Sequence, residues 1–402
     1  MLGRNLVRPL EDDWQESLDA VARARGWPTS RDVAKLGARV ADLSAAYNDA
    51  SRARAAARDA GAARLAFSFV RDVPKGAAAV RELVATGALG LHGTLRVLDV
   101  GAGLGATTWG VARALEAAGF AGALEATWVD TDAEALALGT ALVRARGERG
   151  AVRVTAQAVH RGAGPLDELG RFDLVLAGQV LSELGVGGPE DARVEAHASL
   201  LRAWLDRRVA KGGSLVVVEP ALRDRSRHLH RVRDALVAGG ASVFAPCLHD
   251  APCPMLARET DWCHEDLDVD LPPWLVPVAR AAGLRREGLT FSYLVLRPDG
   301  RRLADAVRAS STAGALRVVS GALASKGKRE LFLCGWAAGP GGAPVPARVR
   351  AARLDRDATD ANVAFEGAAR GEVLVVEPAL DLERPRIGRG THVGSARDAE
   401  TR

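Results

Sequence analysis

Aromatic side chains make up only 4% of this 402-residue sequence, although 48% of its residues are hydrophobic. Alanine, leucine and valine must therefore build most of the core. No stretch approaches the roughly 20 consecutive apolar residues of a membrane-spanning helix. The N-terminal segment turns acidic at Glu11 before the apolar centre of a signal peptide has formed. We therefore expect a cytoplasmic, monomeric protein of two or three domains with no membrane partner.

The sequence also lacks a strong net charge, because 54 basic residues are balanced by 50 acidic ones. This balance alone does not predict a nucleic-acid partner. Nearly all the basic residues are arginine, whose planar fork of donors suits phosphate groups. An arginine-rich composition with solvated surfaces accounts for the same numbers, so composition leaves an RNA partner open.

Cysteine is rare, and the four cysteines have the irregular spacing C-x5-C-x9-C-x70-C: Cys247, Cys253, Cys263 and Cys334. Disulfides are uncommon in a reducing compartment. Four thiolates suit either a tetrahedral zinc ion or an iron–sulfur cluster. The close cysteine pairs of structural zinc sites are missing, which favours the bulkier cluster. Separate buried thiols or two disulfides are the alternatives. His249 and His264 are candidates for hydrogen bonds to sulfur, for metal ligands, or for ordinary loop histidines.

The N-terminal region has the pattern of a helical domain. One apolar stripe with alternating spacings of three and four residues predicts a helix after Asp32: Val33, Leu36, Val40, Leu43 and Tyr47. Thr29 and Asp32 resemble a capping pair at its start. Arg71, Lys75 and Arg81 are expected to give this region a basic side.

A different pattern begins at Leu95, where short apolar runs alternate with alanine-rich amphipathic stretches. The runs are 95–100, 124–129, 152–156, 172–177 and 214–218. Such alternation predicts an α/β fold with a mostly parallel sheet covered by helices. Further strands are expected at 291–296, 316–320, 331–333 and 373–376, with a turn cluster at 339–346.

These patterns predict four parts of the chain. Residues 1–90 form a helical domain, and 91–245 form the α/β domain. Residues 246–338 form a cysteine-rich metal-binding insertion with the last strands of the sheet. Residues 339–402 form a small β-rich extension.

A glycine-rich turn follows the first strand of the α/β domain. Its spacing is G-x-G-x-G at Gly101, Gly103 and Gly105, with Asp99 two residues before the first glycine. Glycines permit a tight turn and close approach of a ligand. Asp130 ends the second strand, where it can accept hydrogen bonds from ribose hydroxyls. The pattern favours S-adenosylmethionine over a dinucleotide, whose usual fingerprint is G-x-G-x-x-G.

Catalytic residues are not evident after the fourth strand. The Asn/Asp-Pro-Pro-aromatic pattern of amino-group methyltransferases is absent there. Gln179 and Glu183 are the nearest candidates to reach a substrate, and an ordinary surface or capping role accounts for them equally well. The sequence therefore supports cofactor binding better than catalysis.

Together these motifs resemble the methyltransferase-like small-ribosomal-subunit assembly family known from mitochondria, with bacterial members. The resemblance covers about residues 42–336. Its motifs are LSAAY at 43–47, DVGAGLGATTW at 99–109, VLSEL at 180–184, APC-x-H-x-x-PCP and WCH around the first three cysteines, and KGKR at 326–329 before the fourth. Leu248 and Glu265 depart from the expected proline and aromatic residue beside the ligands.

The resemblance implies a class I methyltransferase (Rossmann-like) fold, a four-iron, four-sulfur cluster on the four cysteines, and binding to 16S-type rRNA of the small ribosomal subunit. Zinc in place of iron and sulfide, and active rRNA methylation, stay open as alternatives. A radical enzyme is disfavoured because its tight C-x3-C-x2-C run is absent. Two basic segments are expected to form one RNA-binding face, with a solvated helix face as the alternative for the first: 223–233 and 326–329.

Overall fold

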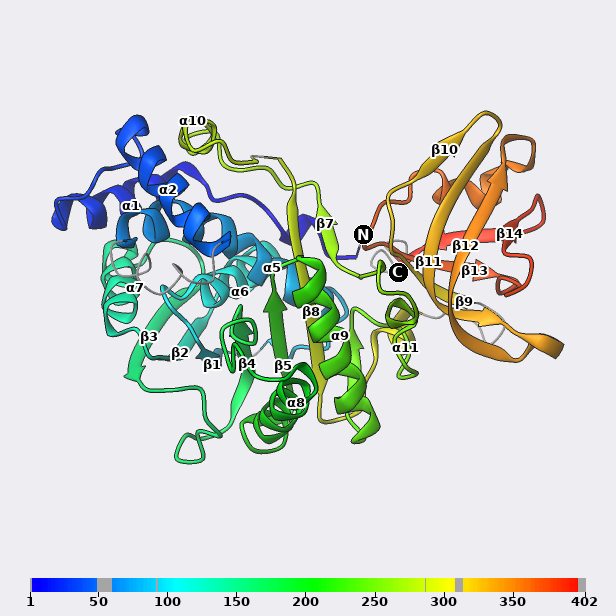
Figure 1. Ribbon diagram of the computed structural model, residues 1–402, viewed down its shortest axis with the longest axis horizontal. Coiled ribbons are helices and arrows are strands. Elements are labelled where there is room, and N and C mark those ends of the chain that lie inside the picture. The colour runs from blue at the N-terminus through cyan, green and yellow to red at the C-terminus, as the bar shows by residue number, and fades with distance from the viewer. Residues whose placement is uncertain (1, 49–59, 92, 286, 308–313, 397–402) are drawn as a thin grey trace.

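A computed structural model describes residues 2–48, 60–91, 93–285, 287–307 and 314–396. Its elements form two lobes, each built on its own sheet (Figure 1). The N-terminal helical elements are η1 (Arg4–Leu6), α1 (Asp12–Ala24), α2 (Val33–Asn48), α4 (Gly61–Ala63), the π-helical η2 (Arg64–Ser68) and α5 (Phe69–Ala85). The predicted capping pair is confirmed, because the backbone N–H of Thr29 donates to Asp32 Oδ2 at 2.9 Å, just before α2.

The first sheet has the strand order β3-β2-β1-β4-β5-β8-β6, with β7 paired to β8. Its strands are β1 (Thr94–Val100), β2 (Ala123–Asp130), β3 (Arg153–His160), β4 (Phe172–Gly178), β5 (Val209–Glu219), β6 (Ser242–Ala245), β7 (Glu265–Leu267) and β8 (Leu289–Arg297). The first five are mutually parallel, and β8 runs antiparallel to β5 and β6. This order is that of a class I methyltransferase, which confirms the predicted α/β fold.

Helices cover both faces of this sheet, as its two-sided apolar strands require. Besides α5, they are α6 (Ala106–Ala117), α7 (Ala133–Arg146), α8 (Glu190–Arg207) and α9 (Arg223–Ala238). The remaining helical elements of this lobe are α10 (Val276–Ala281), which packs against α2 (Figure 1), α11 (Leu303–Val307) and the 3-10 helix η3 (Pro254–Ala257). Alternate residues of a strand face opposite cores. Val97 packs with α5, α6 and α7, whereas the next residue, Leu98, packs with α8 and α9.

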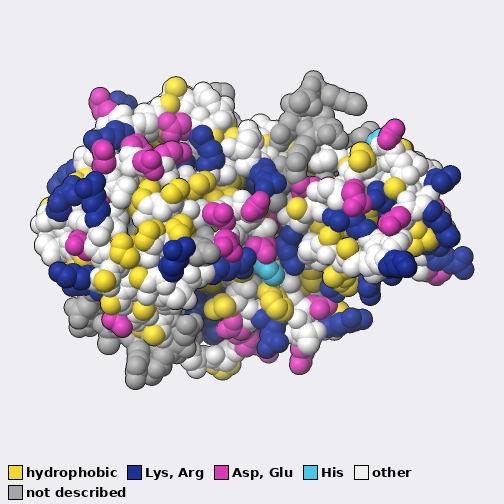
Figure 2. Space-filling view, turned by 90° about the horizontal axis from the view of Figure 1, so that it is seen from above, with side chains coloured by type: hydrophobic (Ala, Val, Ile, Leu, Met, Phe, Trp, Pro, Cys, Tyr) yellow, Lys and Arg dark blue, Asp and Glu magenta, His cyan; other side chains and the backbone are white. Residues whose placement is uncertain are grey.

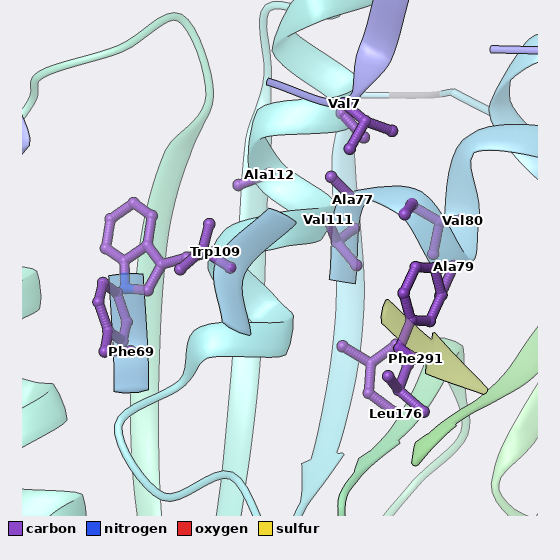
Figure 3. Packing of buried hydrophobic residues seen from close by; sticks show 14 of the residues in the cluster. Val7, Phe69, Ala77, Ala79, Val80, Trp109, Val111, Ala112, Leu176 and Phe291 are labelled. Atoms are coloured by element: carbon purple, nitrogen blue, oxygen red, sulfur yellow. The ribbon is translucent and has the colours of Figure 1, made fainter. Parts of the chain in front are cut away.

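Helices α5 and α6 approach each other closely above the sheet, and Figure 3 shows their side chains packed together with Leu176 and Phe291. Two glycines allow this approach. A Cβ on Gly110 would lie 2.2 Å from the carbonyl oxygen of Val73, and one on Gly76 would lie 2.6 Å from that of Thr107. The contact places α5 beside the start of α6, next to the glycine-rich turn.

The second sheet has the order β14-β12-β11-β9-β13-β15, with β10 paired to β11. Its strands are β9 (Gly314–Val318), β10 (Leu323–Ser325), β11 (Lys328–Ala338), β12 (Pro344–Leu354), β13 (Val373–Glu377), β14 (Arg386–Ile387) and β15 (His392–Ser395), and the 3-10 helices η4 (Pro340–Gly342), η5 (Asp355–Asp357) and η6 (Asp360–Phe365) connect them. The strands expected at 316–320 and 331–333 thus belong to this sheet and not to the first. The reason is the long antiparallel pairing of β11 with β12 on either side of the predicted turn cluster.

A buried ion network joins the two lobes. Arg317 Nη1 of β9 lies 2.9 Å from Glu82 Oε1 of α5, and Arg81 Nη2 lies 3.1 Å from Glu265 Oε2 of β7. The hydroxyl of Tyr293 in β8 donates to Glu82 at 2.8 Å. The expected basic side of the N-terminal domain is therefore wrong for Arg81, which is fully buried because these acids neutralise it.

Candidate functional sites: a glycine-rich pocket and a four-cysteine cluster

The glycine-rich turn connects β1 to α6 with positive φ at each glycine: 68° at Gly101, 51° at Gly103 and 79° at Gly105. A Cβ on Gly105 would lie 2.2 Å from the indole of Trp128, and one on Gly101 would lie 2.4 Å from Val180. The space beside Gly103 is open apart from Arg64, whose Nη2 would lie 3.7 Å from such a Cβ. Gly101 and Gly105 therefore allow the turn to pack closely against its neighbours, whereas the backbone at Gly103 is accessible to a ligand.

Two aspartates hold the turn in place. Asp130, at the end of β2, accepts the backbone N–H groups of Gly103 at 2.7 Å and Asp132 at 2.8 Å. Asp99 is buried and accepts both the hydroxyl and the backbone N–H of Thr108 in α6. Burial raises the pKa of Asp99 to about 7. Asp130 borders the turn directly, whereas Asp99 contacts it through the first turn of α6.

A cavity of about 360 Å³ adjoins the turn at the carboxyl ends of β2 and β3. Its lining includes Arg64, Leu104, Asp132, Glu134 and His160. Arg64 Nη1 lies 2.6 Å from Asp132 Oδ2, so a guanidinium from the π-helical turn spans one side of the cavity. Nothing in the sequence was a reason to select Arg64. Its place in a π-helical turn, a feature often found at functional sites, is evident only in the structure.

The segment after β4 contains the two candidate catalytic residues. Gln179 has a φ of 62°, which is unusual for a residue with a Cβ. Its side-chain amide donates to Asp72 Oδ2 at 3.0 Å, and Asp72 is paired with Lys75 at 2.7 Å. Burial, followed by the charge of Asp130, raises the pKa of Glu183. The structure thus places both residues after the carboxyl end of β4, near the glycine-rich turn.

Glu219, at the end of β5, is a further buried acid that sequence reasoning missed. It accepts the backbone N–H of Leu181 at 2.9 Å, and burial raises its pKa to about 7. Its only sequence signal is an acid directly after the apolar run of β5. Glu219 fixes the loop that contains Gln179 and Glu183.

The four cysteines come together where the two lobes meet. Cys247 follows β6, Cys253 precedes η3, Cys263 precedes β7, and Cys334 lies within β11 of the second sheet. Burial, and then repulsion from the other three thiolates, raises the pKa of Cys334. Among the described residues, no three histidine, cysteine, aspartate or glutamate side chains are spaced for a single metal ion.

The surroundings of these thiols match an anionic, sulfur-rich group. Within the described chain, four nitrogen atoms near the cysteines are buried without a hydrogen-bond partner: Arg233 Nε, His249 Nδ1, Trp262 Nε1 and His264 Nδ1. Buried N–H donors normally have acceptors. His249 Nε2 lies 3.8 Å from Cys334 Sγ. Four thiols with spare donors around them fit an iron–sulfur cluster, whose sulfur atoms accept such bonds.

Helix α9 holds the cysteine-containing loop. Arg227 donates to the carbonyl groups of residues 255, 258 and 261. His230 Nε2 accepts the backbone N–H of Cys263 at 3.0 Å, and Asp234 accepts that of Cys253 at 2.9 Å. Burial lowers the pKa of His230 to about 4, which keeps the imidazole neutral and able to accept.

The expected basic face is therefore wrong for much of α9. Arg227 and Arg233 donate inward to loop carbonyl groups, and His228 Nδ1 lies 2.7 Å from Glu190 Oε1. In the second segment, Lys328 Nζ lies 3.0 Å from Glu330 Oε2. The sequence shows the basic residues but not the carbonyl and carboxylate partners that turn them away from solvent.

Comparison with known proteins gives one family. The family model described as "Mitochondrial small ribosomal subunit Rsm22" matches residues 91–338. No curated protein matches the chain. Among the described residues, no helix is both long and apolar enough to cross a membrane.

Similar solved structures include methyltransferases of low sequence identity. A putative class I S-adenosylmethionine-dependent methyltransferase from Listeria monocytogenes is 13% identical, covering 72% of this chain and 89% of that one, with a TM-score of 0.37. Precorrin-6y C5,15-methyltransferase from Geobacter metallireducens is 17% identical, covering 54% and 85%, with a TM-score of 0.31. A putative RNA methyltransferase from Pyrococcus horikoshii is 18% identical, covering 55% and 83%, with a TM-score of 0.29. The strand order of the first sheet, and not these scores, identifies the fold.

Proposed function

The chain belongs to the mitochondrial small ribosomal subunit Rsm22 family, and we propose that it is an assembly factor that binds the rRNA of the small ribosomal subunit in the cytoplasm. The extent of the family match carries this proposal. Residues 91–338 include the glycine-rich turn, all four cysteines and the strand β11 that joins the lobes. The glycine-rich turn and all four cysteines therefore lie within the part of the chain that defines the family, whereas Arg64 of the pocket lies before it.

We propose that the glycine-rich pocket binds S-adenosylmethionine. Gly103 exposes its backbone to the ligand, and Asp130 lies at the strand end from which a carboxylate can accept ribose hydroxyls. The cavity next to Asp132 and His160 is the place for the adenine ring. In sheets of this strand order, ligands bind at the carboxyl ends of the strands, which is the edge that this cavity borders.

The four cysteines are proposed to hold a four-iron, four-sulfur cluster, with zinc as the alternative. Bound there, the cluster crosslinks three cysteines of the first lobe to Cys334 of the second. The residues around it supply burial and spare N–H donors. Its role is then structural: it fixes the surface where the lobes meet.

Exposed arginines of the second lobe are candidates for phosphate contacts. Figure 2 shows Lys and Arg side chains along the rim of this lobe. Arg350 has a 54% exposed side chain, pairs with Glu330 at 2.9 Å and lies 5.9 Å from the ring of Phe332, which also contacts the less exposed Arg348 at 4.2 Å. Arginine beside an aromatic ring suits RNA, because it can bind phosphate while bases stack nearby.

Active methylation of rRNA is the second candidate function, supported by the backbone at Gln179. A left-handed conformation at a residue with a side chain is found preferentially at active sites. Gln179 and Glu183 lie on the loop that buried Glu219 fixes at the carboxyl ends of β4 and β5. In class I methyltransferases this edge borders the methyl acceptor.

One sedimentation experiment separates the two functions. The full-length protein is incubated anaerobically with small subunits and methyl-labelled S-adenosylmethionine, then separated on a gradient. An assembly factor migrates with the subunits and leaves the rRNA unlabelled. Label in the rRNA that disappears in Asp130→Asn identifies an enzyme. Failure to migrate with small subunits at low salt would overturn the proposal.

A further inference from the structure

We propose that Arg233 of α9 is the built-in counter-charge of the cysteine cluster and that it raises the reduction potential of the bound group. This inference depends on the iron–sulfur cluster proposed above. Arg233 would act on the cluster through its charge and not as a ligand. Three observations carry it: the placement of the guanidinium, its spare donor, and the charges around it.

The guanidinium of Arg233 is held inside the cysteine loop. Its side chain is 3% exposed. Its Nη2 donates to the carbonyl oxygen of His249 and its Nη1 to that of Ala251. Both carbonyl groups lie between Cys247 and Cys253 in the sequence, so the loop that carries two ligands wraps around one cation.

A spare donor of Arg233 supports an acceptor that protein atoms do not supply. In the described part of the chain, its Nε is buried and has no partner, as is true of the Nε atoms of seven other arginines, so the position of this donor beside the cysteine loop is what favours sulfur. A buried guanidinium donor without an acceptor costs free energy comparable to a lost hydrogen bond. When the iron–sulfur cluster binds, its thiolate or sulfide sulfur atoms would provide an acceptor for this donor.

The charges around Arg233 favour a cation facing sulfur. Its guanidinium donates to the segment between Cys247 and Cys253, and its carboxylate partner is Asp234. Asp234 Oδ1 lies 2.7 Å from Arg233 Nη1, but its side chain is 25% exposed. Water therefore screens the carboxylate more than the guanidinium, which leaves net positive charge on the cluster side.

The direction of the effect follows from charge. Reduction adds an electron to an already anionic set of four thiolates. A buried cation nearby stabilises the reduced form more than the oxidised form, so it raises the potential. Removing the cation lowers the potential, and removing the carboxylate that partly neutralises it raises the potential.

The test is a redox titration of the full-length protein loaded anaerobically with ferrous iron and sulfide. Loading is measured as bound iron and sulfide, and the midpoint by absorbance and electron paramagnetic resonance. Arg233→Gln should lower the equilibrium constant for reduction about tenfold, equal to about 59 mV for one electron. Arg233→Lys keeps the charge and should stay within about threefold of the wild type. Asp234→Asn retains an acceptor for Cys253 and should shift the midpoint upward.

Arg227→Gln is the matched control, because Arg227 tethers the same loop through carbonyl groups further along it. It should lower stability without moving the midpoint. If Arg233→Gln does not load, the upward shift expected for Asp234→Asn and the nearly unchanged midpoint expected for Arg233→Lys still decide. Loaded Arg233→Gln and Asp234→Asn with unchanged midpoints would overturn the role of Arg233. A wild-type chain that takes up no iron and sulfide would instead overturn the cluster itself.

Discussion

Arg317 of β9 and Glu82 of α5 form a 2.9 Å ion pair in which both side chains are at most 4% exposed, although 235 positions separate them. Burial opposes the ionisation of Glu82, but Arg317 and Arg81 hold its pKa below the usual range. The pair is the main polar connection between an N-terminal helix and the second sheet. It also lies beside Glu265, two residues after Cys263, so it borders the cysteine cluster.

Removing one partner of this pair should strongly destabilise the protein. Glu82→Gln leaves two buried arginines, Arg81 and Arg317, against the single carboxylate of Glu265, and we expect a loss of about 3–5 kcal/mol in the free energy of unfolding. Arg207→Gln is the control, because it breaks a pair with Asp167 in which the two side chains are each 56% exposed. That change should cost less than about 1 kcal/mol. Equal losses in urea unfolding would contradict the structural role.

Glu219 should make stability depend on pH. Its folded pKa of about 7 lies above the unfolded value, so its unfavourable burial is absent in acid and develops as pH rises from about 4.5 to 7. Glu219→Gln should therefore gain stability relative to the wild type by up to about 3 kcal/mol between pH 5 and pH 8. Urea unfolding at both pH values tests this. A difference that is constant with pH would show that Glu219 is not buried as an acid.

The glycine-rich turn should tolerate no side chain at its third glycine. Gly105→Ala combines a positive φ with a 2.2 Å contact to Trp128, so we expect lost S-adenosylmethionine binding in calorimetry and a clear loss of stability. Gly119→Ala has a similar φ of 82° but nothing within 4 Å of the new Cβ. It should cost only about 1–2 kcal/mol and retain binding. Retained binding in Gly105→Ala would place the ligand elsewhere.

Loss of one cysteine ligand should reduce both metal content and folded yield. Cys263→Ser removes a thiolate from a set whose binding energy is coupled to folding. We expect most of the iron and most of the soluble protein to be lost. Ser226→Ala is a suitable comparison, because Ser226 is buried near the same loop but carries no thiol. A stable Cys263→Ser protein that still binds small subunits would argue against a structural cluster.

Binding to small subunits should weaken steeply with salt. Each arginine that neutralises a phosphate releases counterions, so a protein with several such contacts loses orders of magnitude in affinity between about 50 and 200 mM salt. Arg350→Gln should lower both the affinity and the salt slope, whereas Arg207→Gln, at the end of α8 in the first lobe, should change neither. A flat salt response would exclude the arginine-rich rim as the RNA contact.

The first sheet was predictable because its signal is local. Each parallel strand is a short apolar run between amphipathic helices, and the glycine-rich turn stands directly between such a strand and a helix. The second sheet was only partly predictable. Its strands were expected near the observed positions, but strand assignment to one sheet or another depends on long-range pairing such as Leu333 with Val349. The spacing of hydrophobic residues in the sequence contains no information about which strands pair.

The polar interior was the least predictable part. A helix with arginine at 227, 231 and 233 has the same pattern whether those residues face water or bind loop carbonyl groups. Glu265 shows the same limit. It departs from the aromatic residue that the family resemblance led us to expect, and it is buried against Arg81 and Arg317. A glutamate in place of an aromatic residue is explained only by its two arginine partners, which lie 184 positions before it and 52 positions after it in the sequence.

The cysteines are divided three to one between the lobes, with Cys334 in the middle of β11. During synthesis the first lobe can be complete in sequence while its fourth ligand is still inside the ribosome. A chain cut short before residue 334 retains the glycine-rich pocket but cannot close the ligand set. A cluster held by all four cysteines would therefore assemble only on chains that extend into the second lobe, which would distinguish them from chains truncated before Cys334.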